Sequence, residues 1–427
     1  MSAPPLAAYA LSFTVIDRLA VSLQLGMASA LETLCGQAFG AKQYHMLGIY
    51  LQRSWIILLA TTIILLPFFL FTSPLLRLLG QDPHISHIAG LISIWFIPAI
   101  FSNVFNFTFQ MYLQSQSKNI VISYISFIAI TLHVLLSWLF VIKLQMGISG
   151  AMSSTIITMW MPVIGEFAYV LCGGCPLTWK GFTWSAFTDL WLVVKLSLSS
   201  GAMICLELWY NSILVLLTGY MANAEVALDA LSICLNIALW GLLITLGFLV
   251  AAGVRVANEL GAGNAKATKF SIVVVSVTST FIGFVLSLLI VFFSRNIAYL
   301  FTTSDVVADA VIDMTPLLAI TILFNSIQQV LSGVAVGAGW QTLVAYVNVA
   351  CYYLVGVPLG VILGYVIGYE VKGIWMGMIF GTLVQTLVLL LITFKVDWDK
   401  EVAISKSRVN QWYLPECTEA GSRKECI

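Results

Sequence analysis

The 427-residue chain has very few charged residues. Asp, Glu, Lys and Arg make up 9% of it, whereas 60% of its residues are hydrophobic. Soluble domains carry roughly a quarter charged residues, so this composition excludes an ordinary soluble globule. The 19 basic and 19 acidic residues leave no net charge, which argues against a nucleic-acid partner.

The sequence also lacks the common enzyme motifs. It has no Walker-type phosphate loop, no HExxH and no GxSxG, and the glycines of "GAGNAK" fit neither a P-loop nor a dinucleotide fingerprint. We therefore predict no enzyme activity and no cofactor. Without a nucleotide-binding module, any uphill transport would have to use an ion gradient.

The eight cysteines do not have the pattern of a disulfide framework, because they are scattered along the chain and three of them (Cys205, Cys234 and Cys351) lie inside apolar runs. Cys172 and Cys175 have the CxxC spacing of zinc and redox sites. Zinc needs four ligands, however, and no second pair stands nearby. We interpret the two residues as free thiols in a loop and predict no metal site.

Long apolar runs dominate the chain. Many are 20 residues or more in length, enough to cross a hydrocarbon core of about 30 Å. They are too long for barrel strands and do not alternate in polarity, so we expect transmembrane helices. The expected spans are 6–31, 46–72, 87–113, 119–142, 148–171, 190–219, 226–254, 270–294, 306–336, 342–366 and 373–394, with a polar tail at 395–427.

The basic residues between the spans orient the chain. Twelve lie on one side: Lys42, Lys118, Lys180, Arg255, Lys266, Lys269, Lys395, Lys400, Lys406, Arg408, Arg423 and Lys424. Four lie on the other side: Arg77, Lys143, Arg295 and Lys372. The positive-inside rule assigns the first side, and the C-terminal tail with it, to the cytoplasm.

Two polar islands, "LETLCGQAFGAKQ" at 31–43 and "ANELGAGNAKATK" at 257–269, indicate an internal repeat. Their glycines Gly40 and Gly263 are 223 residues apart, and Gly150 and Gly373 keep the same distance. One shift held over so long a stretch indicates two homologous halves. Both islands fall on the cytoplasmic side, so the halves run parallel, and we interpret the islands as cytoplasmic turns between helices.

The repeat also predicts a missing helix. A shift of 223 residues places the counterpart of helix 190–219 before Met1. We therefore expect an all-α membrane protein with two six-helix lobes, of which the first lacks its first helix in an N-terminally shortened chain. A genuine eleven-span protein is the alternative. The expected domains are an N-lobe at 1–180, a C-lobe at 181–394 and a cytoplasmic tail at 395–427.

Glu207, in "MICLELWYN", is the strongest candidate for a functional residue. It lies near the middle of its span, with no Lys or Arg within a turn. Ionisable groups at membrane depth are expensive, and burial disfavours the charged form of a carboxyl group. Glu207 is thus a candidate for taking up and releasing a proton. Tyr210 and Asn211 follow on the same helix face. The structural alternative is a neutral carboxyl bonded to a neighbouring helix.

Several amides form a second group of candidates. Asn325, Gln328 and Gln329 lie on one stripe of their helix, so they line a cavity or bond across helices. Asn236, in "SICLN", is a further candidate for the transport path.

Two weaker candidates come from the first half of the chain. Asn103 lies 222 residues before Asn325. His133 could relay protons, although a lone histidine in an apolar helix is more often a packing residue.

A set of longer motifs resembles plant members of the multidrug and toxic-compound extrusion (MATE) family, the DETOXIFICATION proteins. These motifs are "GMASALETLCGQAFGAKQYHMLGIYLQRS", "LLGQDP", "KLSLSSGAMICLELWYNSILVLLTG", "VRVANELGAGNAKA", "VLSGVAVGAGWQ" and "YYLVGVPLG". The resemblance extends from about residue 20 to about residue 400. It implies two lobes around a central cleft and export of flavonoids, alkaloids, organic acids or xenobiotics in exchange for protons.

The chain departs from the family pattern at three places. The family's first helix is absent. The proton-coupling glutamate of the seventh family helix matches Glu207, but the acidic partner on the tenth helix of many plant members falls on Asn325. The run "NSIQ…VLSGVAVGAGWQ", which begins at Asn325, resembles the flavonoid-type branch of the family. An amide at this position therefore does not by itself imply an inactive transporter. Asp17 and Arg18 stand where an uncharged stretch is expected.

The sequence thus predicts a secondary antiporter that alternates access between two lobes, with small organic solutes, protons and membrane lipid as its partners. The resemblance implies a monomer in the vacuolar or plasma membrane of a plant cell. An anion channel that uses the same cleft and an inactive truncated form are the alternatives. A lipid flippase ranks below them, because almost no basic residue lies at membrane depth.

Overall fold

The computed structural model describes residues 8–9, 12–78, 80–219 and 224–411, and every regular element in them is a helix. Eleven of these helices are long and apolar enough to cross a membrane. Hydrocarbon offers no partner to a free backbone N–H or C=O, so a spanning segment has to satisfy these groups within its own helix. The prediction of an all-α membrane protein with eleven spans is confirmed.

The chain divides into two compact units, which we call unit 1 and unit 2. Unit 1 takes the described residues of Met1–Ser197, Gly261–Gly263 and Val402–Ile427, and unit 2 takes those of Leu198–Leu260 and Asn264–Glu401. α8 (Leu190–Gly219), α9 (Ala224–Ala262) and α16 (Trp398–Gln411) each contribute residues to both units. Side chains at 14–15, 211, 216, 219 and 224–225 lie outside the described part.

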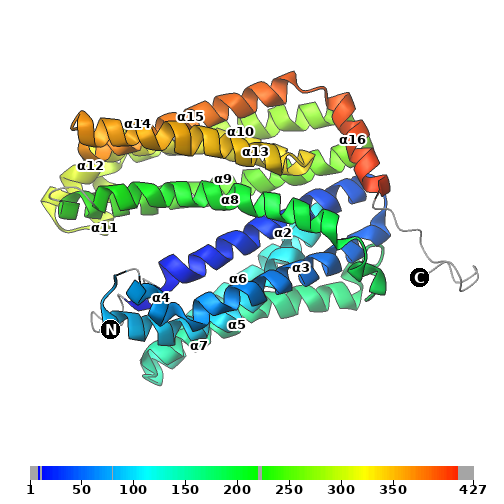
Figure 1. Ribbon diagram of the computed structural model, residues 1–427, viewed down its shortest axis with the longest axis horizontal. Helices are drawn as coiled ribbons and strands as arrows, with labels where there is room; N and C mark the ends of the chain where they lie inside the picture. Colours follow the sequence, from blue (N-terminus) through cyan, green and yellow to red (C-terminus); the bar gives the residue numbers. More distant parts are fainter. Residues whose placement is uncertain (1–7, 10–11, 79, 220–223, 412–427) are drawn as a thin grey trace, which may run out of the picture. The chain divides into compact units, whose positions relative to one another are not determined.

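Unit 1 is built on α2, α3 and α5, which lie side by side (Figure 1). Its elements are η1 (Ser12–Asp17), α2 (Arg18–Gly40), α3 (Tyr44–Leu70), α4 (Thr72–Leu78), α5 (Pro83–Ser115), α6 (Asn119–Ser137), η2 (Trp138–Lys143), α7 (Gly147–Tyr169), η3 (Val170–Gly174) and η4 (Trp184–Phe187). Polar side chains inside this bundle bond across helices. Gln24 on α2 donates from Nε2 to Thr62 Oγ1 on α3 at 2.7 Å and to the Ile100 carbonyl on α5 at 3.0 Å.

Unit 2 packs α12 between α10 and α15. Besides its parts of α8, α9 and α16, it holds α10 (Ala265–Phe292), α11 (Ser294–Phe301), α12 (Asp305–Ala338), α13 (Gln341–Asn348), η5 (Val349–Gly356), α14 (Val357–Val361), η6 (Ile362–Val366) and α15 (Glu370–Lys395). The segments α13 to η6 form one continuous span, Gln341–Val366, in which π-helical and α-helical turns alternate.

The predicted spans end at the wrong residue at both polar islands. The first span was expected to end at 31, but α2 continues to Gly40; the seventh was expected to end at 254, but α9 continues to Ala262. The islands are therefore mostly helix, and only 41–43 and 263–264 form turns. The polar residues of the first island do not break the helix because they are buried within unit 1, with Glu32, Thr33 and Gln37 at most 1% exposed.

The expected polar tail also contains a helix. Residues 398–411 form α16, whose Val402 and Val409 are buried. Its Arg408 donates to Gln37 Oε1 at 3.0 Å. Residues 412–427 lie outside the described part.

Two rows of glycines let helices approach closely in unit 2. Glycines recur every fourth residue on α15 at 373, 377 and 381, and on the facing span at 356, 360 and 364. A Cβ added at Gly377 would lie 2.2 Å from the backbone nitrogen of Gly360. Such small-residue faces are a common way for membrane helices to pack, because van der Waals contact and not water exclusion holds them together.

We predict that Gly377→Ala destabilises unit 2, because the added methyl group meets backbone and not a flexible side chain. Overpacking of this kind costs about 1–3 kcal/mol, to be measured by thermal or denaturant unfolding of the detergent-solubilised protein. Gly247→Ala is the matched control, since a Cβ at this helical position has no atom within 4 Å. Equal unfolding of both variants would contradict the close packing of the two glycine rows.

Candidate functional site

Glu207 on α8 is held by two amides of α12. Gln329 donates from Nε2 to Glu207 Oε1 at 2.7 Å, and Gln328 donates from Nε2 to the same oxygen at 3.1 Å. Both amides are buried, at 5% and 2% exposure, and Glu207 is partly buried. The structure thus brings together three residues that the sequence singled out on two separate helices.

A chain of hydrogen bonds extends from Gln328 and returns to α8, the helix of Glu207. Its Nε2 also lies 3.5 Å from the Tyr352 hydroxyl, which donates to Gln385 Oε1 at 3.0 Å. Gln385 donates to Asn348 Oδ1 at 2.9 Å, and Asn348 donates to the backbone carbonyl of Met203 at 3.3 Å. Met203 lies one turn before Glu207 on α8. We call this set the polar ring: Glu207, Gln329, Gln328, Tyr352, Gln385 and Asn348.

Tyr210 supports the polar ring from outside. Its side chain stacks on Tyr352 with ring centroids 4.2 Å apart and an interplanar angle of 9°. Its hydroxyl donates to the Met378 carbonyl at 2.9 Å. Gly356 and Gly381 make room for this hydroxyl, because a Cβ at these positions would lie 2.2 Å and 2.6 Å from it. The glycine rows therefore fix the place of Tyr210, and through it that of Tyr352.

The backbone around Tyr352 departs from α-helical geometry. Tyr352 lies in the π-helical segment η5, and Pro358 follows at the start of α14. Proline cannot donate to the helical ladder, which favours a local change of its register. π-helical turns occur frequently at functional sites. The π-helical backbone at Tyr352 therefore supports the polar ring as a candidate functional site.

The other predicted residues of unit 2 do not join the polar ring. Asn325 on α12 is partly buried and takes no part in it. Asn236 on α9 is exposed and donates to the Ser232 carbonyl of its own helix at 2.8 Å. The side chain of Asn211 lies outside the described residues.

The weaker candidates belong to unit 1. Asn103 is buried on α5, at 4% exposure. His133 on α6 bonds through Nδ1 to Thr158 Oγ1 on α7 at 3.0 Å, a contact between packed neighbouring helices. Asp17 is buried at the end of η1, whereas Arg18 is exposed.

Sequence reasoning missed two buried carboxyls in unit 1. Glu166 on α7 is fully buried, and neither of its carboxyl oxygens has a hydrogen-bond partner among the described residues. Glu32 on α2 is 1% exposed, and its Oε1 also has none there. Glu166 stands in the apolar run "MPVIGEFAYV", so the criterion that selected Glu207 could have found it. Glu32 was hidden because its island was interpreted as a turn.

Sequence reasoning also missed half of the polar ring. Tyr352 lies in "YYLVGVPLG", a motif that carried the resemblance, and Asn348 is an amide inside the expected span 342–366. Gln385 had no such signal beyond being an amide inside a span.

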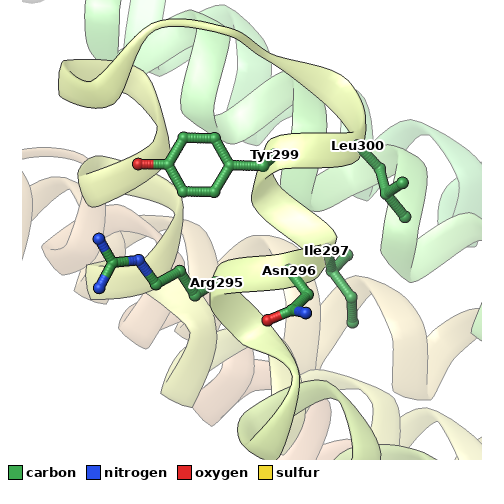
Figure 2. Close-up of a pocket in the computed structure, with 5 residues that line it drawn as sticks. All are labelled: Arg295, Asn296, Ile297, Tyr299 and Leu300. Carbon is green, nitrogen blue, oxygen red and sulfur yellow. The ribbon is translucent and has the colours of Figure 1, made fainter.

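The hollow in Figure 2 lies away from these residues, on the short helix α11. It measures about 490 Å³ and is lined by Arg295, Asn296, Ile297, Tyr299 and Leu300. Tyr299 donates to Asp305 Oδ1 at 2.8 Å, and this hydrogen bond to the carboxylate raises the pKa of Tyr299. The lining comes from one exposed helix, so we assign no function to this hollow.

Comparisons with known proteins place the chain in a family. The MatE family model matches residues 1–139 and 200–362. Protein DETOXIFICATION 22 of Arabidopsis thaliana is 56% identical over 415 residues, which cover 97% of this chain and 84% of that protein. Protein DETOXIFICATION 21 of the same plant is 57% identical over 411 residues, covering 96% and 83%.

A solved structure agrees with the sequence relatives. The crystal structure of the eukaryotic MATE transporter AtDTX14 matches with a TM-score of 0.88 at 32% identity, over 95% of this chain and 90% of that one. MATE proteins are membrane transporters that move small organic solutes, and they are not enzymes. The predicted family is therefore confirmed: the chain belongs to the MATE family of multidrug and toxin efflux transporters.

Proposed function

We propose that this transporter exports organic solutes from the cytosol in exchange for protons, with Glu207 as the group that carries the proton. The two amide donors on Glu207 Oε1 support this role. A low-dielectric surrounding favours the neutral carboxylic acid, whereas two N–H donors stabilise the carboxylate. Because these two effects oppose one another, Glu207 can exist as the neutral acid or as the carboxylate in the same surroundings. A residue that binds and releases a proton reversibly requires this.

The composition of the polar ring fits a carboxyl group that exchanges a proton. Its six side chains are one carboxyl, one phenol and four amides, with no Lys or Arg among them. A carboxyl group among neutral side chains can take up and release a proton at this position.

The polar ring also offers a route from protonation to conformation. Gln328 on α12 bonds to Glu207 on α8 and lies near Tyr352 on η5, so a change at the carboxyl alters hydrogen bonds among three helices. In the proposed cycle, protonation from an acidic lumen or apoplast favours solute release there, and deprotonation toward the cytosol resets the carrier.

We further propose that two lobes, residues 1–180 and 181–394, move so that the solute site opens alternately to the two sides of the membrane. The transporter is proposed to be a monomer in the vacuolar or plasma membrane, with its C-terminus in the cytoplasm. Flavonoids, alkaloids, organic acids and xenobiotics are the solute classes proposed. The excess of basic residues on the C-terminal side supports this orientation.

We predict that Glu207→Gln abolishes gradient-driven solute uptake in proteoliposomes while abundance and thermal stability stay near normal. Glutamine keeps the size of the side chain and still accepts from both amides, but it cannot exchange a proton. Asp309→Asn is the control, since it removes an exposed carboxyl at the start of α12. Proton-coupled uptake retained in Glu207→Gln would show that the carboxyl is only structural.

We predict that Gln329→Leu shifts the pH dependence of transport to higher pH. The change removes one donor that stabilises the carboxylate, so deprotonation requires a less acidic medium. A hydrogen bond to a charged group is worth about 1.5–3 kcal/mol, equivalent to a shift of about one pH unit or more.

Stability should hold in this variant, because Gln329 Oε1 is buried without a partner among the described residues and leucine removes that oxygen. Asn236→Leu is the matched control, since its amide bonds only within its own helix. A pH profile of Gln329→Leu that coincides with the control would refute the electrostatic role of the donor.

We predict that uptake of a flavonoid or cationic dye into proteoliposomes depends on an imposed pH gradient and is accompanied by measurable proton movement. An anion channel would instead carry current without proton coupling, and an inactive form would move nothing. Solute movement indifferent to the pH gradient would remove the antiport proposal.

A further inference from the structure

The segment that joins α7 to α8 and the first turn of α8 expose several large apolar side chains. Residues 175–189 contain only the short turn η4, and α8 begins at Leu190. We call five exposed side chains of this region the linker face: Leu177 (62% exposed), Phe182 (71%), Trp184 (86%), Phe187 (59%) and Trp191 (72%). Trp184 and Phe187 contact one another, with ring centroids 5.6 Å apart.

Two adjacent residues of α3 hold the backbone of this segment. The Gln52 side chain donates to the Gly181 carbonyl at 3.0 Å and accepts from the Thr183 N–H at 2.9 Å. Arg53, which is 1% exposed, donates from Nη2 to the Ser185 carbonyl at 3.3 Å and to Thr188 Oγ1 at 3.4 Å. A buried arginine on a membrane helix is costly, and here its charge is directed to the linker.

The start of the segment is also held by side chains of unit 1. The Thr178 hydroxyl bonds to the Tyr112 hydroxyl at 2.7 Å and donates to Gln116 Oε1 at 2.9 Å, both on or next to α5. Lys118 donates to the Gly174 carbonyl. Trp179 packs on Trp55 of α3, with ring centroids 6.0 Å apart. The inner side of the segment is thus occupied, and the linker face cannot turn inward.

We propose that the linker face is a lipid-contact surface, seated at the boundary between headgroups and acyl chains of the bilayer leaflet at this end of the spans. The segment leaves one span at Gly174 and enters the next at Leu190, so both its ends lie at the membrane surface. Tryptophan and other aromatic side chains are enriched at that depth. Solvent-exposed apolar clusters of this kind otherwise mark binding surfaces.

The charge of the segment favours lipid over a charged macromolecule. Residues 175–191 carry only Lys180 and Asp189, both exposed. A near-neutral, aromatic-rich surface fits the zwitterionic headgroup layer. The contact has a structural consequence, because Val193 in the first turns of α8 is fully buried in the core of unit 1. Lipid contact at the linker face would thus anchor the beginning of the helix that carries Glu207.

The test measures the depth of one labelled position in the full-length protein. In a variant whose native cysteines are replaced, Trp184→Cys receives an environment-sensitive fluorophore, and the protein is placed at one copy per phosphatidylcholine nanodisc. Two further labelled positions serve as references, one for the membrane interior and one for the aqueous phase. Ile128→Cys lies midway along α6 and is 52% exposed, and Asn410→Cys lies exposed at the end of α16.

We expect brominated phosphatidylcholine to quench the label at 184, as it quenches the label at 128, while aqueous iodide quenches it far less than the label at 410. A label at 184 that iodide reaches as readily as position 410 would overturn the proposal. Quenching by neither reagent would also overturn it, because a protein segment would then cover the linker face. Phe187→Cys repeats the measurement if Trp184→Cys fails to assemble. This result does not depend on proton coupling, so it can fail or succeed separately from the proposed function.

Discussion

The absence of water in the membrane interior is the constraint on which this structure depends. A polar side chain inside a span has to find its partner in the protein, because hydrocarbon offers none. The Gln24 amide nitrogen meets this need with a hydroxyl and a carbonyl of two other helices. In unit 2 the same need produces the polar ring, in which Gln385 and Asn348 each serve as donor and acceptor. Glu166 departs from this rule with both carboxyl oxygens, and Gln24, Glu32 and Gln329 with one oxygen each, because these buried atoms have no hydrogen-bond partner among the described residues.

Small residues determine where those polar partners can meet. The glycine rows on α15 and on the facing span bring two backbones into contact and leave space for the hydroxyl of Tyr210. Tyr210 in turn fixes the ring of Tyr352 by stacking. A methyl group at Gly356 or Gly381 would therefore act on the polar ring without touching Glu207. Packing and polar chemistry are coupled in unit 2 through this one tyrosine pair.

The length of the apolar runs made the spans predictable, because crossing the membrane requires a fixed length of helix. The errors fall where polarity along the chain was taken as a sign of a turn. In "LETLCGQAFG" the polar residues continue α2 and are buried by neighbouring helices. A single sequence does not distinguish a polar residue that faces solvent from one that faces another helix. The same limitation hid Glu32 and the helix α16.

The sequence by itself determined the helical membrane class and the number of spans, and it singled out the carboxyl at 207 and the amides at 328 and 329 as candidates. These follow from composition, run length and spacing along single helices, whereas the family followed from the resemblance of longer motifs. That the two amides bond to Glu207 was decided by the tertiary structure. Only the tertiary structure decided that Tyr352, Gln385 and Asn348 complete the polar ring, that Asn236 and Asn325 do not join it, and that the linker face points outward. Those outcomes depend on how far each helix is rotated and how closely it packs, and periodicity along one helix does not specify which residue its neighbour presents.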